Sequence, residues 1–333
     1  MLFALLQTAQ AQFFSGSSMS FGKNRIQHNE ERIWSLFRFE DFDFYFYQDG
    51  RKLTINGAKY AYTALDEMTE KLGYKSGNKI HFIVFNSMSD MKSSNIGLDN
   101  EILYNTGGLT NVVDNKVFLY FNGRYADFER QIRFGTAQVM VNQMLFGESI
   151  SSNVKNSTLL ALPKWYTDGL VSFLADKWSV DLDDKMRDGV MNGKYRKFNH
   201  LEGTDAVIAG HSVWKFVSDK YGPEVIPNII YMTKVSRNVE SGFLYVLGIS
   251  FKNLMDDWYN YYSFLYTKQI KDRTLPVNQG VDFKVKKRPY YYQMQLSPDG
   301  RYMTYVFDKT NKKKLYIYDR QTGKRKKLYR LGT

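Results

Sequence analysis

Apolar runs in the first 121 residues predict strands around one helix. FDFYFY ends at the turn pair Asp49-Gly50, and IHFIVF and KVFLYF have the same aromatic and β-branched character. Between the first two runs, Leu65, Met68 and Leu72 recur at helical spacing, and Gly73 ends the pattern. The strands predicted here cover 42–47, 80–85 and 116–121, and the helix covers 59–72.

The spacing of apolar residues becomes helical from residue 128 onward. FERQIRFGTAQVMVNQMLFG predicts a buried helix over 128–147, because apolar residues recur every three or four positions. The same period continues after Pro163, with stops at Gly222 and Gly248. The further helices predicted cover 165–178, 211–221, 224–233, 241–247 and 251–266.

The last 44 residues return to alternation, with turns at Ser297–Gly300 and Gln321–Gly323. Strands are predicted at 290–296, 301–307, 314–319 and 328–331, about the content of one β-propeller blade. A lone blade cannot bury its faces. We therefore expect the chain to be the front part of a longer protein; the alternative is that this segment packs against the first domain.

The net charge of +12 belongs to the C-terminal segment. Residues 268–333 hold 18 Lys and Arg against 5 Asp and Glu, whereas the rest holds 28 against 29. This shift predicts a domain boundary near 268–285. The runs Lys312–Lys314 and Lys324–Lys327 are interpreted as solvated turns that guard a sheet edge, with an anionic envelope surface and nucleic acid as alternatives.

The N-terminus indicates export. Met1–Leu6 is apolar, and Ala9-Gln10-Ala11 fits a signal-peptide cleavage pattern, which predicts a mature start at Gln12. The missing basic n-region indicates a truncated start, and a buried N-terminal helix is the alternative. The chain has no cysteine, which excludes disulfides and thiolate metal sites and suits a periplasmic protein; a cytoplasmic one also fits if the signal is not real.

Three segments together carry a family resemblance: Lys116–Phe121, Phe128–Met144 and LPKWYTDGL at 162–170. Their order resembles the gluzincin, or peptidase-MA-like, metallopeptidase domain: an edge strand, an active-site helix, and a helix that brings the third metal ligand. His211–Gly222 and Glu240–Trp258 are similar to the family's later segments. Ser-Pro-Asp-Gly with the following Tyr-Ile-Tyr-Asp resembles a blade of a TolB-type propeller.

The resemblance implies an α+β fold: a zincin-like domain with an N-terminal mixed sheet and a helical C-terminal half, then an all-β, propeller-blade-like segment. The expected organisation is a signal peptide (1–11), an N-terminal extension (12–39), a degenerate peptidase-MA-like domain (40–268), a linker (269–284) and the first, incomplete blade of the propeller (285–333).

The zinc chemistry of that family is missing. A gluzincin needs two histidines four residues apart on one helix, with a glutamate after the first to activate water. At the matching positions this chain has Phe134, Gly135 and Gln138. The third ligand corresponds to Asp168, which is one methylene shorter than glutamate. No histidine occurs anywhere in residues 82–199, so no shift of register restores the motif.

Other residues offer no replacement site. His28, His81, His200 and His211 form no pair at three- or four-residue spacing. His211 is interpreted as a capping or core residue, with a place in the vestigial cleft as the alternative. Asp168 is interpreted as bonding within the domain, with lining of a partner cleft as the alternative. Nucleophile-elbow, P-loop and Rossmann patterns are absent.

The sequence therefore predicts a non-catalytic, protein-binding or scaffolding module in the envelope of a Gram-negative cell. It is expected to hold no metal or cofactor, to bind envelope proteins but no nucleic acid, and to touch anionic surfaces through its basic tail. The predicted binding edge contains Val117, Leu119 and Phe121, and the predicted cleft contains Trp165 and His211. The alternative is a zinc metallopeptidase with a rearranged site.

Overall fold

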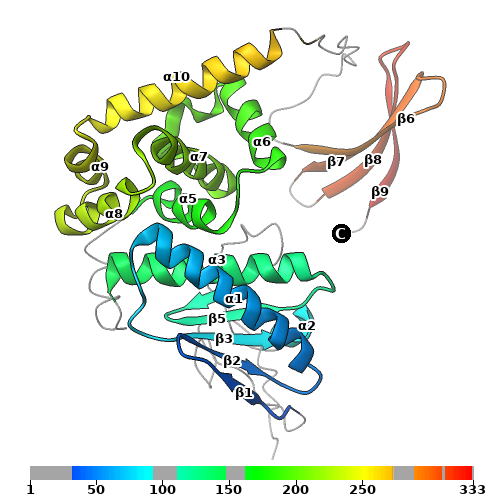
Figure 1. Ribbon diagram of the computed structural model, residues 1–333. Helices are drawn as coiled ribbons and strands as arrows, with labels where there is room; N and C mark the ends of the chain where they lie inside the picture. The colour runs from blue at the N-terminus through cyan, green and yellow to red at the C-terminus, as the bar shows by residue number, and fades with distance from the viewer. Residues whose placement is uncertain are drawn as a thin grey trace, which may run out of the picture. The chain divides into compact units, whose positions relative to one another are not determined.

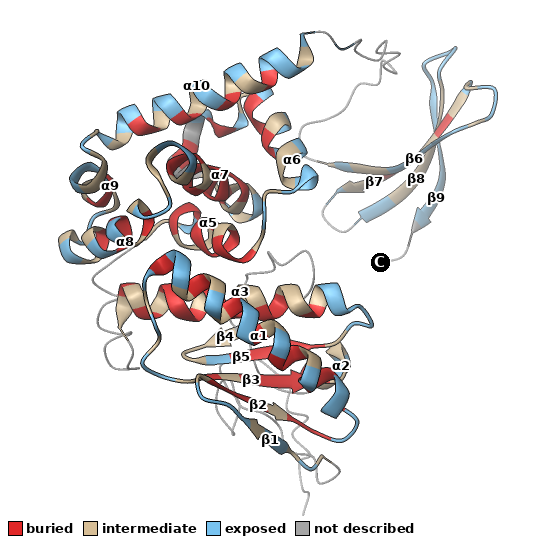
Figure 2. Cartoon of the chain, in the orientation of Figure 1, coloured by how far each residue is buried: buried red, intermediate tan, exposed pale blue. Residues whose placement is uncertain are grey.

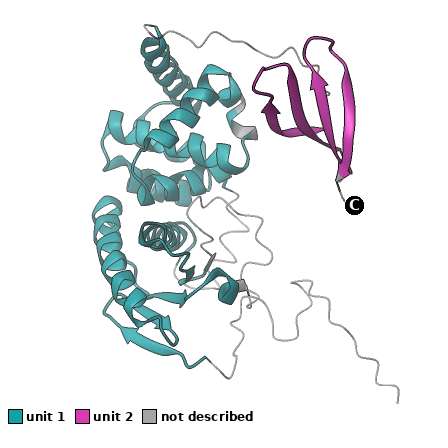
Figure 3. Ribbon diagram, turned by 90° about the vertical axis from the view of Figure 1, so that its right-hand side faces the viewer, with its two compact units in different colours: residues 1–271 teal, residues 272–333 magenta. Residues whose placement is uncertain are grey.

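The computed structural model describes residues 32–92, 111–147, 162–271, 273, 289–309 and 312–331. Among them 56% are helical and 21% lie in strands, arranged as a mixed sheet, an antiparallel sheet and helices, so the predicted α+β class is confirmed. The chain divides into two compact units, 1–271 and 272–333 (Figure 3). The division falls within the stretch where the charge changes.

The first unit contains a five-stranded sheet in the order β1-β2-β3-β5-β4 (Figure 1). β2, β3 and β5 are parallel, whereas β1 and β4 pair antiparallel at the two sides. The predicted mixed sheet is therefore present. The strands are β1 (Ser35–Arg38), β2 (Phe42–Phe46), β3 (Ile80–Phe85), β4 (Asn111–Val113) and β5 (Lys116–Tyr120).

The prediction that residues 116–121 form the edge strand is wrong for the first part of β5. A tight turn, with Asp114 at φ 62°, folds β4 back so that Val112 pairs with Val117. Aspartate tolerates this left-handed conformation better than most residues. Among the described residues, the edge strands are β4 and β1. β1 lies within the predicted N-terminal extension, so the folded domain begins before residue 40.

Two long helices, α1 (Arg51–Leu72) and α3 (Tyr125–Phe146), cover one face of the sheet (Figure 1). The short α2 (Met88–Lys92) contacts β3 and β5. α1 begins eight residues before the predicted start. The prediction was late because the first turns of the helix lack a regular apolar stripe. Gly57 in that stretch allows close packing, because an added Cβ would lie 3.1 Å from rings of both Phe44 and Phe128.

The second half of the unit is helical, as predicted, and its centre is buried (Figure 2). Asp181–Asp184 falls in the first turn of a helix that Ser179 caps. The last helix ends at Ile270, so it includes the first two residues of the predicted linker 269–284. The elements are α5 (Lys164–Ala175), α6 (Val180–Met191), the 3₁₀ helix η1 (Lys194–His200), α7 (Gly203–Tyr221), α8 (Val225–Ser236), α9 (Val239–Leu247) and α10 (Phe251–Ile270).

The second unit is one antiparallel sheet in the order β6-β7-β8-β9. All four predicted strands are present, as β6 (Tyr290–Leu296), β7 (Tyr302–Lys309), β8 (Lys312–Asp319) and β9 (Arg325–Leu331). Among the described residues the sheet closes into neither a barrel nor a propeller.

In the described ranges, no helix has the length and apolar character that crossing a membrane would require. The predicted signal peptide, the mature start at Gln12 and His28 all lie outside the described residues.

Candidate functional site

α3 coincides with the helix predicted at 128–147, and it lies between the sheet and the helical half. One side packs Phe128, Ile132 and Val139 against the sheet and α1. Another side packs Met140 and Leu145 into the helical core. The helix is thus enclosed by packing on two sides, which accounts for its apolar sequence.

Gly135 lies on the side of α3 that meets the sheet. A Cβ added there would come within 2.3 Å of Cγ1 of Val117 on β5, a distance that heavy atoms cannot adopt. Gly135 is therefore needed for close contact between helix and strand. The position matched to the catalytic glutamate has no room for a side chain.

Phe134 and Gln138, matched to the two histidines, are half-buried. The Phe134 ring packs against the helical core, and the Arg130 guanidinium lies 5.4 Å from its centroid. Arg130 also pairs with Asp176, and Nε of Arg133 donates to the carbonyl of Ala175 at 2.8 Å. These bonds hold α3 against the end of α5, so Phe134 is part of a packed interface.

Asp168 lies on α5, half-buried, and the Thr167 hydroxyl donates to its Oδ1 at 3.2 Å. Its Oδ2 is buried and has no hydrogen-bond partner in the described part of the chain. Burial raises the pKa of Asp168 above its ordinary value. Among the four residues matched to the family's metal ligands and base, Asp168 is the one carboxylate.

The glycine after Asp168 has a packing role. A Cβ on Gly169 would lie 2.5 Å from Cα of Gly210, and a Cβ on Gly210 would lie 1.9 Å from the carbonyl oxygen of Trp165. α5 and α7 therefore cross with their backbones in contact. This crossing explains the glycine of the Trp-x-x-Asp-Gly pattern.

His211 does not line a cleft, contrary to one of the two sequence interpretations. It is 1% exposed and lies between the rings of Phe173 and Trp178. Its Nδ1 shares a hydrogen bond of 2.9 Å with Oγ of Ser172, which is also buried. Burial lowers the pKa of His211 to about 3, so the imidazole is neutral at physiological pH. This serine–histidine pair is out of reach of a substrate.

Trp165 is likewise a core residue rather than a cleft residue. It is 2% exposed and stacks on Phe251, with Phe198 against its edge. Val117 and Leu119 are fully buried in the sheet, whereas Phe121 is half-buried against Tyr125. The predicted edge and cleft residues are thus mostly interior, because α1 and α3 cover the strand residues and the helical core encloses Trp165 and His211.

Among the described residues, no three His, Cys, Asp or Glu side chains gather into a group that could hold a metal ion. His81 belongs to a charged row across the sheet instead, in which Arg38, Asp43, His81 and Lys116 pair in register. Asp43 is buried there, 3.4 Å from Lys79 and 3.6 Å from His81 Nδ1. Burial lowers the pKa of His81 and so favours its neutral form, and the ion pairs around Asp43 are made by Lys79 and Arg38.

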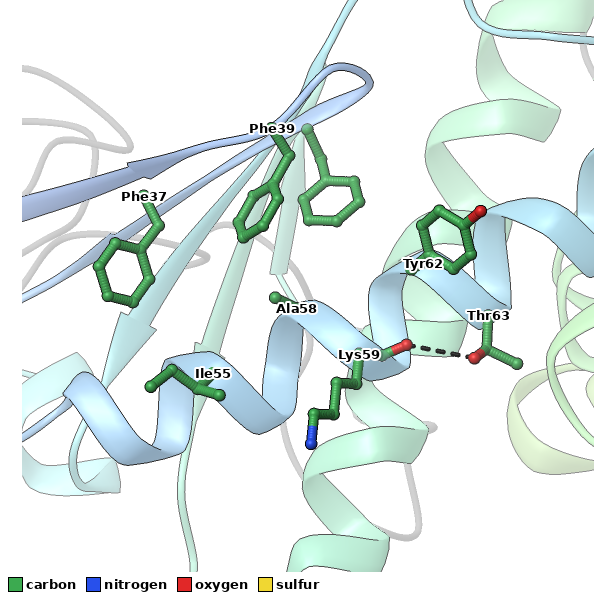
Figure 4. A pocket seen from close by; sticks show the side chains of 8 residues that line it. Phe37, Phe39, Ile55, Ala58, Lys59, Tyr62 and Thr63 are labelled. Carbon is green, nitrogen blue, oxygen red and sulfur yellow. Dashed lines mark hydrogen bonds between the residues drawn. The ribbon is translucent and has the colours of Figure 1, made fainter.

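A hollow on the first unit lies away from these residues, between α1 and β1. It measures about 660 Å³, and Lys59 is its one charged lining residue. Figure 4 shows the rings of Phe37, Phe39 and Tyr62 and the side chain of Ile55 around it. The sequence pattern did not indicate this groove, because residues 12–39 were expected to form an extension. The apolar residues of FRF at 37–39 were the only feature of β1 that pointed to it.

No family model and no curated protein matches this chain.

Proposed function

We propose that this chain is a non-catalytic, peptidase-like protein-binding or scaffolding module of the Gram-negative cell envelope, joined to the beginning of a TolB-type β-propeller. The observation that carries the proposal is α3. It stands between a mixed sheet and a helical half, where a zincin-like domain keeps its metal, and the positions matched to ligands and base hold Phe134, Gly135 and Gln138.

Packing supports the loss of catalysis. Zinc sites need three protein ligands and an open coordination position. Here the Phe134 ring fills an interface, Gly135 contacts Val117, and Asp168 has one partner hydroxyl. These residues stabilise the join between sheet and helices. A binding module requires such packing to keep its surface in place, whereas a hydrolytic zinc centre requires metal ligands at these positions.

Binding rather than chemistry is therefore the proposed activity, and exported envelope proteins are the proposed partners. A sheet edge can pair with a partner's backbone without any metal. The competing proposal is a zinc metallopeptidase with a rearranged site, for which Asp168 with its unpartnered Oδ2 is the favouring feature.

Metal analysis separates the two proposals. The purified chain is dialysed with zinc, freed of loosely bound metal by gel filtration, and measured by mass spectrometry beside an Asp168→Ala variant. We expect far less than one zinc per chain in both samples. Stoichiometric zinc in the wild type that the variant lacks, with chelator-sensitive cleavage of casein, would refute the non-catalytic proposal.

A peripheral contact with anionic surfaces is proposed for the second unit. Paired residues of antiparallel strands share a face of the sheet. The register therefore places these cations on the face that also carries Tyr305 and Tyr316: Lys309, Lys312, Lys314, Arg325, Lys327 and Arg330. The strand carboxylates Asp308 and Asp319 lie on the opposite face, with Lys313 and Lys326. The excess positive charge thus lies on one face.

A further inference from the structure

We infer that the groove between α1 and β1 binds an extended segment of a partner protein, with alternating apolar residues and acidic residues at one end, which joins the sheet beside β1. This inference rests on the proposed protein-binding function and names the surface and the chemistry of its partner.

The floor of the groove is apolar and reaches solvent. Its lining consists of Phe37, Phe39, Phe42, Ile55, Ala58, Lys59, Tyr62 and Thr63. Phe39 is 39%, Ile55 43% and Tyr62 70% exposed (Figure 4), although they line the same hollow as the buried Phe42 and Ala58. Apolar surface of this kind, concave and continuous with the core, is typical of a binding groove.

β1 supplies the backbone part of the interaction. It pairs with β2 alone among the described strands, so its outer side offers unpaired amide and carbonyl groups. Phe37 points to the groove side, where its ring contacts Phe46. A strand added beside β1 would direct every second side chain to the same side. Backbone pairing and apolar contacts would then be made by one segment.

Charge at the rim decides the composition of that segment. Residues 51–65 of α1 contain Arg51, Lys52 and Lys59 and no acidic residue. The Arg51 guanidinium lies 5.8 Å from the Phe37 ring, and Lys59 lines the groove. None of these cations forms a salt bridge within the described part of the chain. Acidic side chains near this end of the groove would therefore gain charge complementarity.

The other end of the groove has the opposite character. An adjoining hollow of about 160 Å³ is lined by Asp41, Asp66 and Lys75, and Asp41 pairs with Lys75 at 3.0 Å. The cations free for a partner are thus confined to the Arg51–Lys59 end. The acidic residues of the bound segment belong at that end alone.

Two other occupants fit less well. A helix in the groove would leave the outer backbone groups of β1 unpaired. A second copy of this chain, pairing β1 with β1, would present Ser35–Arg38, which contains no acidic residue to meet the cations at the Arg51–Lys59 end. An extended segment of apolar and acidic residues would pair with the β1 backbone, cover the apolar floor of the groove and meet the cations at its rim.

The test begins with selection of a random 12-residue phage peptide library on the full chain. We expect enriched peptides that alternate apolar residues and carry Asp or Glu towards one end. Tyr62→Glu and Lys59→Glu should each weaken a selected peptide by about tenfold or more, measured by fluorescence polarisation. Tyr245→Glu and Lys252→Glu are the matched controls, since Tyr245 is 65% exposed and Lys252 is exposed on α10. Circular dichroism confirms that each variant is folded.

Peptide N-methylation then tests strand addition. Methyl groups on the alternate amides that face β1 should abolish binding, whereas methyl groups on the other amides should leave it. The inference is overturned if the selection enriches no such peptides, if groove and control variants bind alike, if both methylation patterns are tolerated, or if Tyr62→Glu instead dissolves a dimer. Stoichiometric zinc would refute the proposed function separately, because groove binding is read without catalysis.

Discussion

His211 shows at the scale of single residues how burial turns a candidate ligand into a structural group. Its Nδ1 is hydrogen-bonded to Ser172 and its ring lies between two aromatic side chains. Desolvation disfavours the imidazolium, which lowers the pKa to about 3. The neutral imidazole is thus part of the helical core.

The pH dependence of stability follows from this pKa. The folded pKa lies below the ordinary value of 6.5, so the unfolded state takes up the proton first as pH falls. The contribution of His211 to stability is present above pH 6.5 and is lost as the pH falls from there to about 3, on the order of 5 kcal/mol in all.

His211→Asn should therefore flatten the dependence of unfolding free energy on pH below 6.5, although a smaller side chain lowers stability at every pH. Urea unfolding from pH 8 to 4.5 measures the slope. His81→Gln is the control, since His81 is less buried and should contribute a smaller slope. An unchanged slope in His211→Asn would mean that folding does not lower the pKa of His211.

At the scale of elements, two helix contacts depend on glycine. α3 meets β5 at Gly135 against Val117, and α5 crosses α7 at Gly169 against Gly210. In each case the missing side chain lets two elements approach more closely than any other residue allows. The motif positions that suggest a peptidase are thus also the positions where the layers meet.

Gly135→Ala tests the first contact. The added methyl group should cost about 1–3 kcal/mol through overpacking, even though alanine favours a helix by about 1 kcal/mol. Gly57→Ala in α1, where the nearest atoms are ring edges at 3.1 Å, is the matched control and should change stability less. Chemical denaturation gives both values.

Val117→Ala should partly rescue Gly135→Ala, because it removes the atoms that the methyl group meets. A double-mutant cycle with no coupling between residues 117 and 135 would contradict the packing role of Gly135.

At the scale of the whole molecule, the two units differ in charge as well as in fold. The first unit is nearly neutral in sequence up to residue 267, whereas the second carries the basic excess. Since the register sorts cations to one face of the β6–β9 sheet, that face rather than the net charge defines the proposed anionic contact.

Two double variants with the same change of charge test this assignment. Lys314→Glu with Lys327→Glu alters the cationic face, and Lys313→Glu with Lys326→Glu alters the opposite one. Binding to vesicles of three parts phosphatidylcholine to one part phosphatidylglycerol should fall by about thirtyfold or more in the first pair, since each lysine at such a surface contributes about 1 kcal/mol. The second pair should bind nearly as the wild type does. Equal loss in both would attribute binding to net charge alone.

The α+β class, the strands of the tail and most of the other strands and helices could be predicted from the sequence, because hydrophobic periodicity records which residues face a core. The absence of a histidine motif was equally plain, since it needs only residue identity. The sequence pattern did not predict α2, α6 or η1. It also missed β1, β4 and the first turns of α1, because these segments are held by tertiary contacts rather than by local pattern.

The sequence by itself determined what this protein lacks and how its elements follow one another. Only the tertiary structure decided which residues are accessible. Trp165 is enclosed by Phe198 and Phe251 from later in the chain, and His211 by Phe173 and Trp178 from an earlier segment. Lys116–Phe118 is paired with β4. Phe37, Phe39 and Tyr62 meet in an open groove between α1 and β1, the outermost strand of the sheet on that side. Burial and edge position depend on which distant segments pack together, which local periodicity does not record.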